Sequence, residues 1–297
     1  MTADKKTEFA SRLRNGDYLT APGVFDLVSA RIADRMGFPA LYMTGYGVVA
    51  SSFGLPDAGL ASYTEMVDRV KTIAAGTLTP LIADGDTGYG GLLNVQRTVR
   101  GYEQAGAVAI QLEDQKIPKK CGHTPNRRVI PVDDMVAKIR VAVAARESEN
   151  FLVIARTDAR TQYGLAEAIG RGQAFAKAGA DVVFVEAPES VDEMIEICRE
   201  IDGPLMANMV NGGKTPILSA EELKDLGYQI VIFPGTALLA AGSAVQSVYQ
   251  HLKATGSSRG LPTPLYDFEE FNRLMGFEEV WAFEKKWTDP SGSQWAL

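Results

Sequence analysis

Eight short apolar runs recur along the chain, and amphipathic helical segments lie between them. Nearly continuous apolar runs of this length indicate strands that are buried on both faces, as in a parallel sheet. The pattern predicts a (β/α)8 TIM barrel, and an open doubly wound sheet is the alternative. The runs lie at residues 18–21, 40–43, 81–83, 109–112, 152–155, 182–185, 205–207 and 230–233.

Helical periodicity is clear in several of the intervening segments, at residues 132–146, 165–178, 191–200 and 220–226. Ser219 stands just before one of them, with Glu222 three residues later, which is the pattern of a capping box. Glycines that typically end helices precede several of the strands. These are Gly37, Gly76, Gly106, Gly179 and Gly227.

The C-terminal part of the chain has a different pattern. The stretch at 254–260 is the only one with linker composition, and two amphipathic segments follow near 267–274 and 277–286. A segment this short cannot bury its aromatic residues alone, so we expect it to pack on the barrel or on a neighbouring subunit. We therefore predict a barrel domain at 1–253 and a helical extension at 254–297.

Composition and charge narrow the functional classes. The chain is 46% hydrophobic and 23% charged, which is typical of a globular protein. A net charge of −7 without a basic block argues against nucleic-acid or anionic-membrane partners. Membrane-spanning and signal-peptide patterns are not found in the sequence. With only Cys121 and Cys198, a disulfide framework is not expected, and a cytoplasmic location is predicted. Cys198 lies among apolar helical positions and is expected to be a packing residue.

Polar residues follow most of the predicted strands, at the end of a barrel where active sites form. Packing alone does not explain several carboxylates in one place, because like charges repel. The residues at these strand ends are Thr44, Asp84, Glu113, Arg156, Glu186 and Asn208.

Three of the carboxylates suggest a metal site. Asp84, Asp86 and Glu113 would lie at adjacent strand ends, and oxygen ligands without a nearby His or Cys pair favour Mg²⁺, with Mn²⁺ also possible, over Zn²⁺. The alternative is a glycine-rich turn in which the two aspartates only form Asx hydrogen bonds. A phosphate-binding loop is poorly supported, because the chain lacks a Walker lysine.

A second candidate is the cysteine in the sequence Lys-Lys-Cys-Gly-His at 119–123. Neighbouring lysines favour the thiolate, so Cys121 could exchange a proton near neutral pH. Gly122 would give the loop the freedom that a lid needs. The alternative is a loop cysteine without a chemical role. The other histidine, His251, lies far along the chain from these residues.

Taken together, these motifs resemble the isocitrate lyase/phosphoenolpyruvate mutase superfamily. The likeness runs from about residue 10 to 250 and rests on segments 42–45, 54–57, 84–90, 113–115, 119–123 and 154–159. The resemblance implies an (α/β)8 barrel, commonly a homotetramer that exchanges its last helix between subunits. It also implies Mg²⁺ and a small 2-oxo or 2-hydroxy dicarboxylate ligand.

The resemblance further implies roles for individual residues. Thr44, Gly45 and Tyr46 would bind the substrate carboxylate, and Cys121 would be the general acid on the gating loop. The base stays open between Tyr42, Glu186 and a hydrogen-bonded pair involving Arg156. The remaining residues assigned to the site are Asp57, Lys120, Gly122, His123 and Asn208.

Within the superfamily, the cysteine motif resembles that of the carbon–carbon lyases. Segment 208–216 is similar to that of 2,3-dimethylmalate lyase and of carboxyphosphonoenolpyruvate phosphonomutase, and it lacks the Glu-Phe-Gly typical of 2-methylisocitrate lyases. Leu239 stands where those last enzymes place an arginine for a third carboxylate. The expected reaction is Mg²⁺-dependent cleavage of an alkylmalate to a 2-oxo acid such as pyruvate plus a carboxylate. The alternatives are phosphorus–carbon chemistry, 2-methylisocitrate cleavage, and non-catalytic binding of dicarboxylates.

Overall fold

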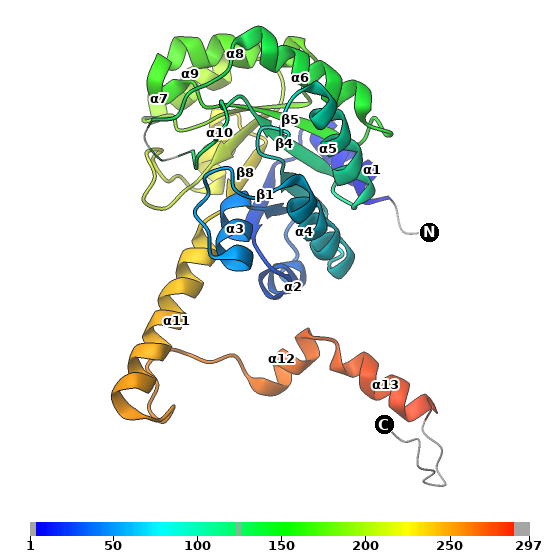
Figure 1. The fold of residues 1–297 in the computed structure, drawn as a ribbon, viewed down its shortest axis with the longest axis vertical. Helices are drawn as coiled ribbons and strands as arrows, with labels where there is room; N and C mark the ends of the chain where they lie inside the picture. The colour runs from blue at the N-terminus through cyan, green and yellow to red at the C-terminus, as the bar shows by residue number, and fades with distance from the viewer. Residues whose placement is uncertain (1–3, 123, 125, 288–297) are drawn as a thin grey trace. The chain divides into compact units, whose positions relative to one another are not determined.

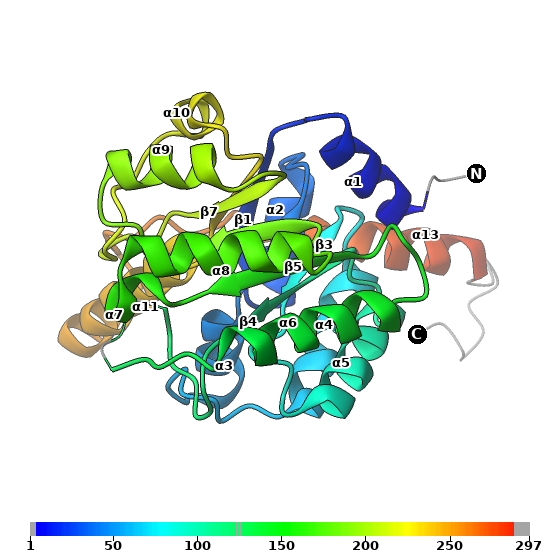
Figure 2. The same cartoon turned by 90° about the horizontal axis from the view of Figure 1, so that it is seen from above.

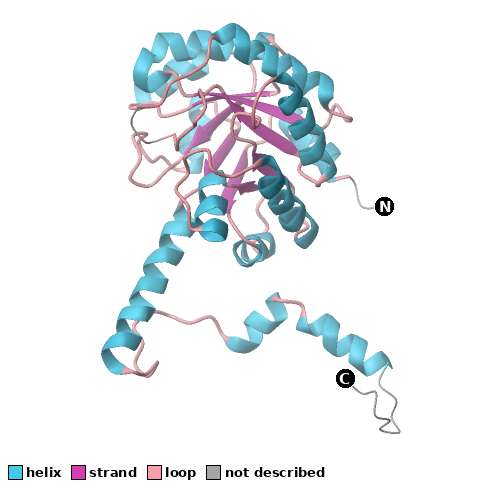
Figure 3. Cartoon of the chain, in the orientation of Figure 1, coloured by secondary structure: helices cyan, strands magenta, loops and turns pink. Residues whose placement is uncertain are grey.

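The computed structural model describes residues 4–122, 124 and 126–287. Eight parallel strands form a closed barrel in chain order, β1 to β8, which confirms the predicted fold (Figure 1). Figure 3 shows these strands inside a layer of helices. The strands are β1 (Leu19–Val24), β2 (Leu41–Met43), β3 (Leu81–Asp84), β4 (Ala109–Glu113), β5 (Leu152–Thr157), β6 (Val182–Val185), β7 (Leu205–Asn208) and β8 (Ile230–Phe233).

The strand register places two of the predicted site residues side by side. Leu19 pairs with Ile230, which closes the barrel between β1 and β8. Glu113 of β4 lies directly beside Arg156 of β5, so parallel pairing alone brings a carboxylate and a guanidinium together. The polar residues predicted at separate strand ends therefore meet at one end of the barrel.

Helices cover the outside of the barrel, and Figure 2 shows α4, α5, α6 and α8 around the strands. The predicted helical segments are confirmed, and Ser219 caps its helix through a capping box with Glu222. The helices of this unit are α1 (Lys5–Arg14), α2 (Leu27–Arg35), α3 (Gly45–Phe53), α4 (Tyr63–Gly76), α5 (Leu92–Gln104), α6 (Val132–Ala145), α7 (Arg160–Tyr163), α8 (Leu165–Lys177), α9 (Val191–Glu200) and α10 (Ala220–Leu226).

Apolar side chains fill the barrel interior toward the amino ends of the strands. Phe9 and Leu13 of α1 belong to the same core cluster as Leu19, Leu152 and Phe184 of the strands. Most strand residues in this cluster lie at the amino ends of their strands, so α1 covers that end of the barrel. The predicted polar site residues lie at the opposite end of the barrel, where the strands have their carboxyl ends.

A second compact unit spans residues 241–297, and its boundary with the first, at 240/241, falls within α11 (Thr236–Thr255). Its described part also contains α12 (Phe268–Leu274) and α13 (Phe277–Trp287), so both predicted amphipathic segments are helices. The domain boundary predicted after residue 253 stays a prediction. Across the described residues, no helix combines the length and apolar character needed to cross a membrane.

Candidate active site

A cavity of about 300 Å³ lies at the carboxyl ends of the strands. Gly45 and Asp86, which were also predicted for the site, lie next to this cavity rather than on its lining, and His123 lies outside the described residues. The predicted residues on the lining are Tyr42, Thr44, Tyr46, Asp57, Asp84, Glu113, Lys120, Cys121, Gly122, Arg156, Glu186 and Asn208.

The turn after β2 borders the cavity through Thr44 and Tyr46. Thr44 is the N-cap of α3, and its hydroxyl accepts a hydrogen bond from the Gly47 N–H at 3.3 Å. The Gly45 N–H donates to Asp84 Oδ2 at 3.3 Å. A Cβ at Gly45 would lie 2.6 Å from that oxygen, so the close approach requires glycine. A helix N-terminus of this kind favours a carboxylate group.

Asp84 is positioned from inside the barrel by a residue that the sequence analysis did not identify. Gln111, fully buried on β4, donates from Nε2 to Asp84 Oδ1 at 3.3 Å and accepts from the Tyr42 hydroxyl at 2.7 Å. Burial raises the pKa of Tyr42 well above its ordinary value, and the charge of Asp84 adds to the shift. Tyr42 is therefore a neutral hydrogen-bond donor in this arrangement.

Glu113 has a buried acceptor atom without a partner. Its Oε1 has no hydrogen-bond partner among the described residues, and its Oε2 lies 3.6 Å from Arg156 Nη1. Burial raises the pKa of Glu113 well above its ordinary value, although Arg156 opposes the shift. A buried carboxylate of this kind gains most from a cation bound in the cavity.

The described residues do not form a complete metal site from side chains alone. Within 4–122, 124 and 126–287, no group of three His, Cys, Asp or Glu residues is arranged to hold a metal ion. Asp84 and Glu113 both face the main cavity, and the unsatisfied Glu113 Oε1 fits a cation that takes oxygen ligands and keeps several waters. The predicted Mg²⁺ site stays a prediction.

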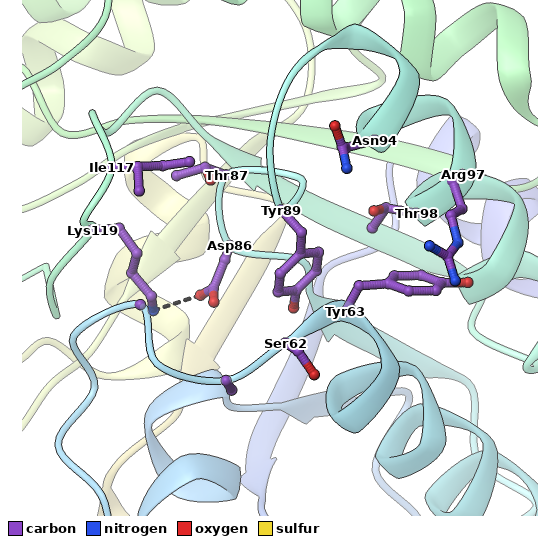
Figure 4. Close-up of a pocket in the computed structure, with 12 residues that line it drawn as sticks. Ser62, Tyr63, Asp86, Thr87, Tyr89, Asn94, Arg97, Thr98, Ile117 and Lys119 are labelled. Atoms are coloured by element: carbon purple, nitrogen blue, oxygen red, sulfur yellow. Dashed lines mark ion pairs between the residues drawn. The ribbon is translucent and has the colours of Figure 1, made fainter.

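Lys119 separates the main cavity from a neighbouring cavity of about 310 Å³, which Asp86 and Tyr89 also line (Figure 4). Its Nζ lies 2.5 Å from both Asp57 Oδ1 and Asp86 Oδ1, and the lysine side chain is 6% exposed. Burial lowers the pKa of Lys119, but the surrounding carboxylates outweigh burial and leave it well above its ordinary value. Lys119 is therefore a fixed positive charge that ties the β4–α6 loop to two other loops.

Arg156 is the central cation of the site. Its guanidinium binds Asp158 through two hydrogen bonds of 2.9 Å, and its Nη2 lies 3.2 Å from Glu186 Oε2. Asn208 Nδ2 donates to the same Glu186 oxygen at 3.0 Å. Burial opposes the charge of Arg156, but Asp158, Glu186 and Glu113 hold its pKa well above its ordinary value. This network fixes a cation and a carboxylate in front of the cavity.

The loop that carries the predicted acid lies over this network. Cys121 lines the cavity, and its N–H donates to the Asp57 carbonyl at 3.2 Å. Lys120 is also bound to Gln115, near the start of the same loop. The Lys120 N–H donates to the Gln115 side-chain oxygen at 2.9 Å, and the Gln115 side-chain nitrogen donates to the Lys120 carbonyl at 2.7 Å. These contacts hold Lys120, Cys121 and Gly122 against the cavity, and we refer to this position of the loop as closed.

One wall of the cavity is apolar, and the sequence analysis identified only Leu239 from it. The other apolar residues of this wall are Val210, Ile232, Pro234 and Leu238. Lys214, the one cationic residue in segment 208–216, binds Glu189 at 3.3 Å and is not part of the lining. This wall therefore suits alkyl groups rather than a further carboxylate.

Comparisons with known proteins identify relatives along most of this chain. Residues 9–253 match the family model described as phosphoenolpyruvate phosphomutase. The chain is 46% identical over 279 residues to 2,3-dimethylmalate lyase of Eubacterium barkeri, covering 94% of this chain and 96% of the relative. It is 42% identical over 270 residues to a 2-methylisocitrate lyase of Aeropyrum pernix, covering 91% and 86%. A crystal structure of 2,3-dimethylmalate lyase superposes with a TM-score of 0.90 at 37% identity, covering 96% of each chain.

Proposed function

Because this chain belongs to the phosphoenolpyruvate phosphomutase family, we propose that it is a divalent-metal-dependent lyase that cleaves 2,3-dimethylmalate or a closely related alkylmalate. The expected assignment to the lyases of the isocitrate lyase/phosphoenolpyruvate mutase superfamily is confirmed by these relatives. The single observation that carries the substrate proposal is the cavity wall. It presents Leu239 and Val210 beside a fully polar network, and this suits a dicarboxylate with alkyl substituents.

The polar side of the cavity would bind the end of the substrate that carries the 2-hydroxy acid. The dipole at the N-terminus of α3, where Thr44 and Tyr46 line the cavity, would attract one carboxylate. Asp84 and Glu113 would hold Mg²⁺ or Mn²⁺, with Asp86 contributing through water. When bound, the metal would polarise the C2 hydroxyl and carboxylate oxygens of the substrate.

The reaction breaks the C2–C3 bond of the substrate. C2, with its hydroxyl, methyl and carboxylate, becomes the 2-oxo acid pyruvate, and the bonding electrons stay on C3, next to its carboxylate. The C2 hydroxyl must lose its proton. Glu186 is the favoured acceptor, acting as part of its pair with Arg156. Tyr42 is not favoured, because it keeps its proton and donates a hydrogen bond to Gln111.

Cys121 would then protonate C3, so that the second product is propionate when the substrate is 2,3-dimethylmalate. The closed loop would keep bulk water away from the carbanion, so that C3 receives its proton from Cys121. Lys119 and Lys120, on the same loop, add positive charge near the substrate carboxylates.

The test is product analysis with purified protein, racemic 2,3-dimethylmalate and Mg²⁺. Proton NMR should show pyruvate and propionate in equal amounts. Phosphorus NMR with phosphonopyruvate tests the second candidate, phosphorus–carbon chemistry. The match of residues 9–253 to the phosphoenolpyruvate phosphomutase family model favours this candidate. A protein that dicarboxylates stabilise against heat without any turnover would instead be a binding protein, and this result would overturn the lyase proposal.

We also propose that the protein is a cytoplasmic homotetramer in which the C-terminal helices pack on neighbouring subunits. The helices of the second unit leave large apolar side chains uncovered by one another, among them Tyr249, Phe268, Trp281 and Phe283. Burying such side chains between subunits would remove this area from water. Light scattering coupled to size exclusion should give four times the chain mass of 32.0 kDa.

A further inference from the structure

Two adjacent arginines, Arg127 and Arg128, lie in the C-terminal part of the β4–α6 loop and differ in their exposure to solvent. Arg127 is 3% exposed, whereas Arg128 is exposed to solvent. They lie near the root of the loop, where Gln115 bridges to Val129 and the Lys116 N–H donates to the Arg128 carbonyl at 2.7 Å. Because a buried guanidinium is costly unless it is paired, the contacts of Arg127 indicate what it does.

Arg127 binds residues that follow β5. Its Nη1 donates to Asp158 Oδ1 at 2.6 Å, and its Nη2 donates to the Thr161 hydroxyl at 2.6 Å. The Asp158 oxygen that accepts from Arg127 also accepts from Arg156 Nη2, at 2.9 Å. One buried carboxylate is therefore shared between a loop arginine and the arginine of the cavity.

The rest of the Asp158 environment is fixed by the barrel. Its N–H donates to Asp114 Oδ1 at 2.9 Å, and Asp114 also accepts from Thr157 and from Arg171 of α8. Among the described residues, Arg127 is the only one on the β4–α6 loop that donates a hydrogen bond to the Asp158 carboxylate. The barrel contacts of Asp158 do not depend on the position of the loop, whereas its contact with Arg127 does.

We propose that Arg127 is a positioning residue that holds the β4–α6 loop closed and, through Asp158, couples closure of the loop to the orientation of Arg156. With the loop closed, Arg127 fixes Asp158 Oδ1, and Asp158 directs Arg156 toward Glu186. Arg127 itself does not line the cavity. The effect on turnover rests on the proposed function, whereas the effect on loop closure does not.

The loop effect can be measured without any substrate. Cys121 lies in the loop, and iodoacetamide labelling of its peptide, followed by mass spectrometry, reports opening of the loop. Cys198 is an internal control, because burial in the barrel unit raises its pKa to about 11 and slows its reaction. Arg127→Met should increase the labelling rate of Cys121 at least fivefold, with no change at Cys198. The matched control Arg128→Met should label like the wild type.

The coupling to Arg156 is tested by steady-state kinetics. Arg127→Met should lower kcat about 10- to 100-fold, because small errors in the position of a catalytic group have effects of this size. The KM should change much less, since Arg127 does not touch the substrate. Arg127→Lys should recover part of the loss by keeping the charge. If Arg127→Met does not fold, Thr161→Val removes one partner of the guanidinium and should give the same changes, several-fold smaller.

The outcomes are distinguishable. Equal Cys121 labelling in Arg127→Met and Arg128→Met would overturn the role of Arg127 in closure, whatever the activity. Faster labelling with kcat unchanged would overturn the coupling to Arg156. If the wild type cleaves no alkylmalate but labelling still rises in Arg127→Met, the proposed function fails and the role in closure stands.

Discussion

Gly122 of the β4–α6 loop lies directly against Arg156 of β5. A Cβ at position 122 would come within 2.3 Å of Arg156 Nη2 and within 2.9 Å of the Glu186 side chain. Real side-chain atoms do not approach this closely, so any residue other than glycine must move the loop or the arginine. The closed loop and the Arg156–Glu186 pair are therefore compatible only because position 122 has no side chain.

Gly122→Ala should lower kcat/KM at least tenfold by preventing full closure of the loop over Arg156. The measurement is pyruvate release from 2,3-dimethylmalate in a coupled assay. Gly170→Ala is the matched control, because a Cβ there meets nothing within 4 Å, and the helical position should gain up to about 1 kcal/mol of stability. Wild-type activity in Gly122→Ala would mean that the loop closes in another way.

Cys121→Ser should lower kcat about 10²- to 10⁴-fold, the usual contribution of a general acid or base. A serine hydroxyl is a far weaker acid than a thiol, so it cannot deliver the proton to C3 at a useful rate. Binding of pyruvate, measured by calorimetry, should persist because the cavity keeps its shape. Cys198→Ser, far from the cavity lining on α9, should keep its turnover. A fully active Cys121→Ser variant would rule out the cysteine as the acid.

The barrel and most of the residues that line the cavity could be predicted from the sequence, and the reason is physical. Strands buried on both faces need continuous apolar runs, so residues 182–185 could be identified from their composition alone and form β6. Parallel strands then bring their last residues together, which places Asp84 beside the β4 residues and Glu113 beside Arg156.

Loop residues could not be predicted in this way, because a loop has no periodicity that assigns side chains to a face. Lys119 and Lys120 are adjacent, and the sequence does not show that Lys119 is the one buried between two aspartates. The same holds for Arg127 and Arg128. Asp86 was expected beside Asp84 in the cavity, but its backbone takes a positive φ of 48°, and its carboxylate lies beside Lys119 at the neighbouring cavity.

Activity should require a divalent cation. Glu113 Oε1 is buried without a hydrogen-bond partner among the described residues, and Asp84 faces the same cavity. After treatment with EDTA and dialysis, turnover should be lost, and Mg²⁺ or Mn²⁺ should restore it. Glu113→Gln should weaken the activation by Mg²⁺, since the amide is a poorer ligand than a carboxylate. Full turnover in metal-free protein would exclude the proposed role of Asp84 and Glu113.

The preferred substrate should be an alkylmalate rather than the tricarboxylate 2-methylisocitrate. Leu239 lines the cavity, at the position where the resemblance to 2-methylisocitrate lyases implies an arginine, and Lys214 is engaged by Glu189. An unpaired carboxylate at this wall loses several kcal/mol, and each ~1.4 kcal/mol is a factor of ten in kcat/KM. The ratio of kcat/KM for 2,3-dimethylmalate over 2-methylisocitrate should therefore be well above ten.

A substitution at the same position tests whether charge at this wall causes the preference. Leu239→Arg should lower the ratio by at least tenfold, because the new guanidinium can pair with the third carboxylate. Leu239→Met keeps the volume and adds no charge, so it should leave the ratio within about threefold of the wild type. If the wild type prefers 2-methylisocitrate, another cation must hold the third carboxylate, and Lys120, on the lining, would be the first to replace. If Leu239→Arg and Leu239→Met behave alike, the apolar wall does not determine which acid is cleaved.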